Sequence, residues 1–296
     1  MTMEYRGHSA KMSRRTVLQR GVAGAALISG MGMAAKVLAE EPTPGMTQGP
    51  YWVDEMLNRS DVTTDPSTGQ VALGFPLRLT ICVSQLDADG NPTPLPGAFV
   101  DIWHCNAVGV YSDVAAQNTV GMKFLRGYQV TNARGIARFT TIYPGWYSGR
   151  TVHIHYRVRV YDADTDTVTY NQVAQFFFND QTTDQIHLTA PYNEHPGRDT
   201  YNNTDGIYEA DSDDDGVADG QELLLTMSAK QNYALATYNI DLDLNDPDLS
   251  NGDQGDTGGG PPDGGGGGMP PDGPPPDGGT PPDGGFPPGG GPPPAS

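Results

Sequence analysis

Basic side chains are scarce in this sequence. Its 296 residues include 17 lysines and arginines against 36 aspartates and glutamates, which gives a net charge of −19 at pH 7. A protein that binds nucleic acid needs a basic patch that displaces counterions from the phosphates, so this composition argues against a nucleic-acid partner. The acidic balance suits a soluble exported protein instead.

Cysteine is nearly absent as well. The two cysteines, Cys82 and Cys105, both fall in segments of strand composition. In an oxidising compartment they could form a disulfide, provided that the strands bring their backbones within bridging distance. The alternative is two buried free thiols, and the sequence leaves both open.

The apolar run over residues 21–35 is shorter than the roughly 20 residues that a membrane-spanning helix needs. It follows the pair Arg14-Arg15 and ends in small residues suited to cleavage, at Ala39. This arrangement resembles a twin-arginine export signal. We therefore expect residues 1–39 to be a signal peptide, with no stable membrane anchor, and the mature protein to be periplasmic or extracellular.

Aliphatic side chains almost disappear after residue 250. The tetrapeptide Pro-Pro-Asp-Gly recurs there, beginning at Pro261, Pro270, Pro275 and Pro281. Such a segment cannot bury a core that would offset its ordering entropy, so residues 251–296 are predicted to be a disordered acidic tail. Residues 40–250 remain as one domain of ordinary size, about 200 residues long.

Long helical periodicity is missing from this domain. Short runs rich in Val, Ile, Thr and aromatic residues are separated by turn residues. The runs are 76–83, 98–104, 136–142, 152–161, 168–178, 221–227 and 234–242. Short helices are expected at 182–188 and 53–59. The pattern predicts an all-β fold, a β-sandwich core of mixed strands with long connecting loops and few short helices.

The segment Tyr147 to His155 holds a phenol, a guanidinium and two imidazoles within nine residues. Side chains alternate along a strand, so His153 and His155 point the same way and can converge on one metal ion. The intervening apolar residues, beginning with Ile154, are expected to face the core. A hydrogen-bonded structural histidine is the alternative for each imidazole.

A second tyrosine, Tyr111, follows a predicted strand and a glycine-containing loop. Alone it would be a packed aromatic residue. Together with Tyr147 and the two histidines it completes a set of two phenols and two imidazoles. Phenolates are hard anionic donors, so this set favours trivalent iron over zinc, which more usually recruits Cys and carboxylate besides His.

These residues lie in motifs that resemble the intradiol ring-cleavage dioxygenases, the family of protocatechuate and catechol dioxygenases. Residues 100–112, VDIWHCNAVGVYS, are similar to the family's first tyrosine motif. Residues 143–155, YPGWYSGRTVHIH, are similar to its second tyrosine, arginine and histidine pair. The segments 173–180 and 201–208 are also similar to blocks of the family, so the resemblance covers most of the chain from 94 to 242.

The resemblance implies a non-haem Fe(III) held by Tyr111, Tyr147, His153 and His155. It further implies that Tyr147 leaves the ion when a catechol-type aromatic diol binds, and that O2 then cleaves the ring to a cis,cis-muconate-type diacid. Arg150 matches the arginine that stabilises negative charge on the ring. The match of Gln175 to a glutamine near the site is weaker, since an amide within a strand explains it equally well.

The chain departs from the catechol dioxygenases in two respects. Only five residues separate Tyr147 from His153, as in exported members of the family, and this leaves fewer residues to wall the pocket. A long N-terminal helical region is missing, so the oligomeric state stays open.

A second metal signal lies downstream. Acidic residues occupy positions one, three, five, nine and twelve of a calcium-loop pattern with glycine at six; they are Asp211, Asp213, Asp215, Asp219 and Glu222. The flanking sequences do not resemble two helices. Calcium is therefore a second candidate cofactor, with a solvated acidic turn as the alternative.

A different class of function is a non-catalytic exported β-sandwich binding module. Turn motifs such as 131–135 and 143–147 also resemble those of carbohydrate-binding sandwiches. A module of that kind has no need for two tyrosines, an arginine and a His-x-His pair at these spacings. The sequence therefore favours the enzyme.

Overall fold

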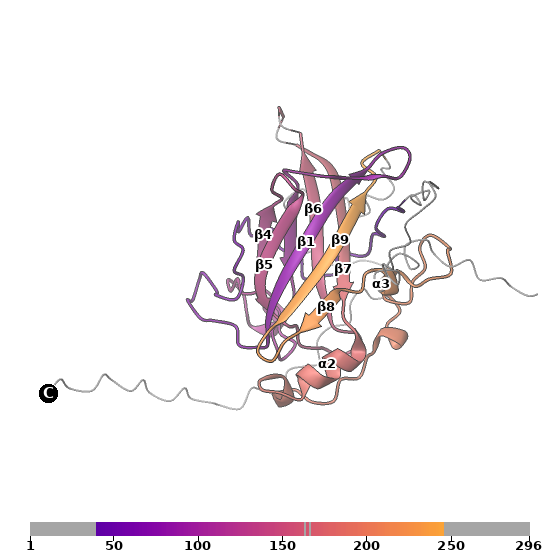
Figure 1. Cartoon of the computed structure of the whole chain (residues 1–296). Coiled ribbons are helices and arrows are strands. Elements are labelled where there is room, and N and C mark those ends of the chain that lie inside the picture. Colours follow the sequence, from indigo (N-terminus) through magenta and orange to yellow (C-terminus); the bar gives the residue numbers. More distant parts are fainter. Residues whose placement is uncertain (1–39, 163, 166, 246–296) are drawn as a thin grey trace, which may run out of the picture.

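The computed structural model describes residues 40–162, 164–165 and 167–245 (Figure 1). The predicted signal peptide and the predicted tail lie outside the described residues. The strands are β1 (Pro76–Leu86), β2 (Pro92–Pro94), β3 (Phe99–Trp103), β4 (Arg126–Val130), β5 (Ile136–Ile142), β6 (His153–Tyr161), β7 (Val168–Phe177), β8 (Thr226–Ala229) and β9 (Ala234–Leu242). The helices are α2 (Asp180–His187) and α3 (Asp219–Glu222), with 3-10 turns η1 (Ala115–Gln117), η2 (Tyr192–Glu194) and η3 (Asn202–Thr204).

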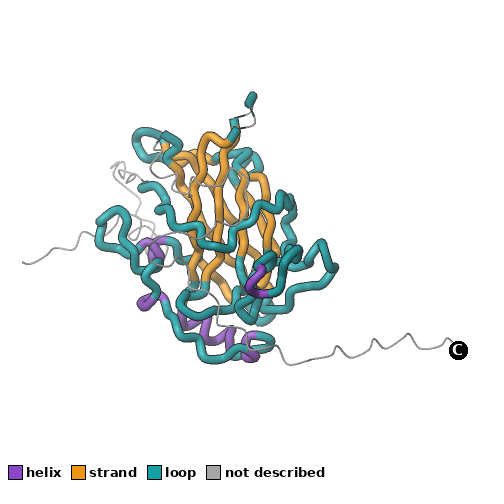
Figure 2. Tube along the Cα trace, turned by 180° about the vertical axis from the view of Figure 1, so that it is seen from behind, coloured by secondary structure: helices purple, strands orange, loops and turns teal. Residues whose placement is uncertain are grey.

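The strands form two sheets that pack face to face. The first sheet has the order β2-β1-β9-β8, with β5 also paired to β1, and the second has the order β4-β3-β6-β7. The β1 and β9 strands run parallel and the other named pairs run antiparallel, so the first sheet is mixed and the second is antiparallel. Figure 2 shows the strands together in the middle, with loops around them and α2 at one end. The predicted all-β sandwich is confirmed.

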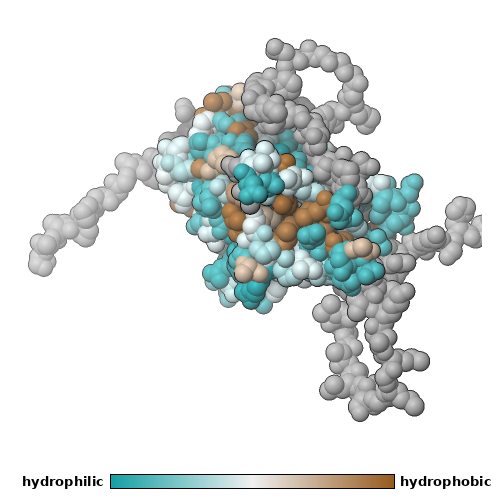
Figure 3. Space-filling view, turned by 90° about the horizontal axis from the view of Figure 1, so that it is seen from above, coloured by the Kyte–Doolittle hydropathy of each residue, from teal (hydrophilic) through white to brown (hydrophobic). Residues whose placement is uncertain are grey.

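Alternation along the strands builds the core between the sheets. In β1 the side chains of Leu77, Leu79, Ile81 and Val83 are buried, while the residues between them are exposed or half-buried. In β6, Ile154, Tyr156 and Val158 face the same core, as expected. Polar residues cover much of the face shown in Figure 3, and apolar residues form a smaller area among them.

The other face of β6 is buried too, because an extended segment, residues 43–57, covers it; we call this segment the N-terminal arm. Its Met46 amide donates to the carbonyl of Val173 on β7 at 2.7 Å. Further along, Asp54 forms an ion pair with Arg159 of β6 at 2.9 Å. The arm therefore closes the outer face of the second sheet, where the predicted histidines lie.

The helix expected at 182–188 is present as α2, and the Asn179 side chain caps it by accepting from the amide of Thr182. The prediction of a helix at 53–59 is wrong. Met56 has a φ of 47°, and its amide donates a hydrogen bond to the Asp54 side chain. No helix in the described ranges combines the length and the apolar character that crossing a membrane requires.

The strand expected at 221–227 is also wrong in its bounds. Residues 219–222 form α3, and β8 begins only at Thr226. The helical turn is held by tertiary packing, since the Gly220 backbone lies directly against the Tyr208 ring. The structure also adds β2 and β4, which were not predicted.

Both cysteines are free thiols. Cys82 is half-buried in β1, and Cys105 is buried just after β3, in the other sheet. The alternative of two free thiols is therefore the one found, although Cys82 is not fully buried.

Candidate metal centre

The predicted site residues come from three places that the fold brings together. His153 and His155 stand on β6, and Trp103 at the end of β3 pairs with His155. Tyr111 lies in the loop after β3, while Tyr147 and Arg150 lie in the loop between β5 and β6. Because β3 and β6 are neighbours, the loops at their shared end meet around the two histidines.

The four donor atoms lie around one point. The Nε2 atom of His153 is 3.4 Å from the hydroxyl of Tyr111, 3.3 Å from that of Tyr147 and 3.1 Å from Nε2 of His155. Each of the four residues is at most 2% exposed. The structure thus places all four predicted ligands in one water-excluding cluster.

The backbone orients the His153 ring. Its Nδ1 lies 2.6 Å from the carbonyl oxygen of Thr151. A carbonyl only accepts, so Nδ1 carries the proton and Nε2 presents its lone pair to the cluster. Burial lowers the pKa of His153 to about 3 and holds the pKa of His155 well below its usual value. Both imidazoles are therefore neutral, the form that binds metals.

Burial has the opposite effect on the two phenols. It raises the pKa of Tyr111 and that of Tyr147 well above the ordinary value for tyrosine, and for Tyr147 the Arg150 cation offsets part of the rise. Both are protonated in the protein without a metal. A trivalent ion would displace those protons and gain two hard anionic oxygens, so the donor set fits Fe(III).

Arg150 belongs to a buried polar network next to this cluster. Its Nε donates to Asp205 at 2.9 Å, and its Nη2 donates to the side-chain oxygen of Gln175. Gln175 stands opposite His155 in the β6–β7 register, and its amide nitrogen donates to the carbonyl of Thr47 in the N-terminal arm. The structure therefore brings Arg150 and Gln175 to the same site as the four donors.

Sequence reasoning missed three residues of the site. Trp103 stacks on the His155 ring with centroids 4.8 Å apart, and Tyr51 of the N-terminal arm stacks on Tyr111 at 4.4 Å. Burial raises the pKa of Tyr51 to about 12. Asp205 is the third. Trp103 and Asp205 lie within segments quoted for the family resemblance, whereas no signal distinguished Tyr51.

Two glycines allow the tyrosine loops to touch. A Cβ on Gly145 would lie 2.5 Å from the carbonyl oxygens of both Asn106 and Ala107, and its amide donates to Asn106 O at 3.0 Å. Gly109 has a φ of 85°, and a Cβ added to it would lie 2.3 Å from the carbonyl oxygen of Trp146. The backbones that carry Tyr111 and Tyr147 are thus packed directly against each other.

We expect Gly145→Ala to separate these loops. Overpacking of this kind costs about 1–3 kcal/mol of stability, and the two tyrosines would move apart, so bound iron should fall. Thermal unfolding and iron content measure the two effects. Gly206→Ala is the control, because its Cβ meets nothing within 4 Å. Equal iron content in both variants would show that this contact does not set the distance between the tyrosines.

The predicted calcium loop is only partly assembled. Asp211, Asp213 and Asp215 offer carboxylate oxygens within 4.8 Å of one another. Asp219 instead accepts a hydrogen bond from the Ser212 amide, and Glu222 is buried in α3. Exposed acidic groups commonly gather without an ion, so calcium stays a prediction from the sequence.

Comparisons with known proteins place this site in a family. Residues 47–195 match the family model Dioxygenase_C, described as Dioxygenase, and no curated protein matches the chain. An intradiol ring-cleavage dioxygenase from Tetranychus urticae has a similar solved structure, with 27% identity, a TM-score of 0.56, and coverage of 69% of this chain and 95% of that one. The chain belongs to the dioxygenase family. Within it, the chain is of the intradiol ring-cleavage type.

Two further solved structures resemble the chain. The dioxygenase domain of a dioxygenase and carbohydrate-binding protein fusion from Streptomyces sp. SirexAA-E is 26% identical, has a TM-score of 0.46, and covers 69% of this chain and 99% of its own. Catechol 1,2-dioxygenase from Pseudomonas arvilla C-1 is 20% identical, has a TM-score of 0.44, and covers 68% and 62%.

Proposed function

We propose that this chain is an exported ferric dioxygenase that cleaves a catechol-type ring between the two hydroxyl-bearing carbons. O2 is the second substrate, and a cis,cis-muconate-type diacid is the product. The observation that carries the proposal is the buried convergence of two phenols and two imidazoles beside Arg150, in a chain of this family. Export is supported by the twin-arginine pattern of the sequence.

Tyr111, Tyr147, His153 and His155 would hold the Fe(III). When bound, the ion would supply Lewis acidity that polarises the diol oxygens and makes the ring reactive toward O2. Tyr147 would act as a base when the diol binds: burial favours its protonated phenol, so Oη would take a proton from a substrate hydroxyl.

Arg150 and the arm have electrostatic and solvent-excluding roles. Arg150 is 3% exposed and held by Asp205 and Gln175, so its positive charge is fixed before negative charge develops on the ring. The N-terminal arm excludes bulk water through Tyr51, which lies over Tyr111. Low local polarity strengthens the interaction between the cation and the ring.

Oxygen uptake tests the proposal. Mature protein purified from the exported fraction and loaded with Fe(III) should be coloured by tyrosinate-to-iron charge transfer. It should consume one O2 for each ring cleaved, because both oxygen atoms enter the diacid. A panel of substituted catechols and hydroxyquinols would identify the preferred substrate. A colourless protein after iron loading, with no uptake on any diol, would favour the non-catalytic binding module.

A further inference from the structure

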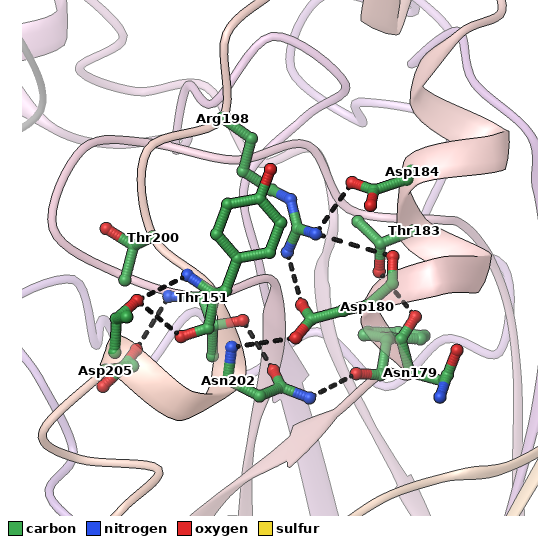
Figure 4. Close-up of polar contacts among 12 residues, drawn as sticks. Thr151, Asn179, Asp180, Thr183, Asp184, Arg198, Thr200, Asn202 and Asp205 are labelled. Atoms are coloured by element: carbon green, nitrogen blue, oxygen red, sulfur yellow. Dashed lines mark hydrogen bonds and ion pairs between the residues drawn. The ribbon is translucent and has the colours of Figure 1, made fainter.

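Asp205 is a buried carboxylate that contacts Arg150 and Thr151, in the loop between Tyr147 and His153. It lies directly after η3 and is 1% exposed. Figure 4 shows it facing Thr151, 54 residues away in sequence. The loop from 148 to 152 has no strand pairing other than the Tyr147–Arg150 bridge, so its conformation depends on such contacts.

Each oxygen of Asp205 has its own pair of donors. Oδ2 accepts from Nε of Arg150 at 2.9 Å and from the amide of Thr151 at 2.7 Å. Oδ1 accepts from the amides of Ile207 and Tyr208, at 2.8 and 3.3 Å. Oδ2 therefore holds the loop of residues 148–152, while Oδ1 holds the turn that follows Asp205.

The two groups on Oδ2 lead to different parts of the metal centre. Arg150 also donates a hydrogen bond to Gln175, which stands opposite His155. The carbonyl of Thr151 accepts a hydrogen bond from Nδ1 of His153. A single oxygen atom thus links the Arg150 guanidinium with Thr151, the residue whose carbonyl orients His153.

We propose that Asp205 is a positioning residue, which holds the Arg150 guanidinium and the Thr151 backbone in one arrangement. In this arrangement both the cation and the His153 ring point toward the metal centre. This inference rests on the proposed function. Asp205 does not touch the reacting atoms, so its effect on the reaction passes through Arg150 and through the orientation of His153.

Asp205→Asn is a selective test of this role. An asparagine oxygen can keep the turn at Ile207 and Tyr208, because such turns accept either residue. Its NH2 group would then face the Nε–H of Arg150 and the N–H of Thr151, which are also donors. The variant therefore keeps the local turn and removes the link to the site.

A double-mutant cycle with Arg150→Ala separates positioning from a general structural role. We expect Asp205→Asn to lower kcat per bound iron by roughly 100-fold with little change in KM, because a fixed cation acts mainly on the transition state. In the Arg150→Ala background the same change should cost less than about threefold, since groups that act as a unit are not additive. The ferric charge-transfer band should also shift, and iron should pass to a chelator faster.

Asp184→Asn is the matched control. Asp184 also pairs with an arginine, Arg198, at 2.8 Å, but within the described residues it has no hydrogen bond or ion pair with residues 150–153. It should keep wild-type kcat, band position and rate of iron loss. If Asp205→Asn does not fold, the double-mutant cycle is repeated with Asp205→Glu. This variant keeps the charge and displaces it by one methylene.

Two results would overturn the inference in an active enzyme: an equal cost of the Asp205 change with and without Arg150, or a band and an iron-loss rate that match the Asp184 control. A wild-type protein that binds iron but cleaves no diol contradicts the proposed function instead. In that case the band and the iron-loss rate still decide whether Asp205 orients His153.

Discussion

Replacing His155 by alanine is expected to give a folded protein that binds ferric iron at least about 100-fold more weakly and does not turn over catechols. Changes to residues that merely support a metal ligand cost 10–100-fold in affinity, so removal of a ligand should cost at least the upper end. His155 is fully buried, stacked on Trp103, and its Nε2 lies 3.1 Å from that of His153.

Iron content after loading and dialysis against a chelator measures this loss, and oxygen uptake measures turnover. The control is His187→Ala, which removes an imidazole that lies outside the cluster and bonds to the carbonyl of Pro144. That variant should keep wild-type iron content. Full iron occupancy and turnover in His155→Ala would remove the ligand assignment, whereas equal losses in both variants would indicate general destabilisation.

The parts of the fold that could be predicted are those in which local alternation and tertiary burial agree. The β1 strand alternates regularly, so its start and its buried face follow from Leu77, Leu79 and Ile81, although it runs to Leu86, beyond the predicted end at 83. The short β2 and the glycine-containing β4 give no such signal. The helical turn α3 stands where a strand was expected, and it packs against Tyr208 through Gly220, a tertiary contact that the local sequence pattern does not show.

The same distinction applies to the site. His153 and His155 stand two residues apart on one strand, so their convergence follows from strand geometry alone. No such rule brings Tyr111 and Tyr147 together, since the contact between their loops depends on close backbone approach at Gly109 and Gly145.

Tyr51 and Asp205 could not be placed from sequence spacing. Tyr51 reaches the site only because the N-terminal arm crosses the outer face of the second sheet. Asp205 reaches it through contacts with residues more than 50 positions away. An aromatic residue in an irregular segment and an aspartate in a turn have ordinary local explanations, so their roles emerge only from tertiary packing.

Iron affinity should rise steeply with pH, and Tyr147→Phe should lower the slope by about one proton. Burial holds the pKa of Tyr111 and of Tyr147 well above the ordinary value, so the metal-free protein keeps both phenol protons at neutral pH. The pKa of His153 is lowered to about 3, and that of His155 is also lowered, so neither imidazole releases a proton near neutrality. Binding therefore releases two phenol protons, and affinity should rise roughly 100-fold per pH unit in the wild type and 10-fold in the variant.

Competition with a chelator between about pH 5.5 and 8 measures both slopes. Hydrolysis of the ion and protonation of the chelator contribute equally to each protein, so the difference between the slopes isolates the Tyr147 proton. The control is Tyr192→Phe. Burial also raises the pKa of Tyr192, but its hydroxyl donates to the carbonyl of Tyr143, outside the cluster, and that variant should keep the wild-type slope. Equal slopes for Tyr147→Phe and the wild type would mean that Tyr147 stays protonated when iron binds, and its assignment as an anionic ligand would fail.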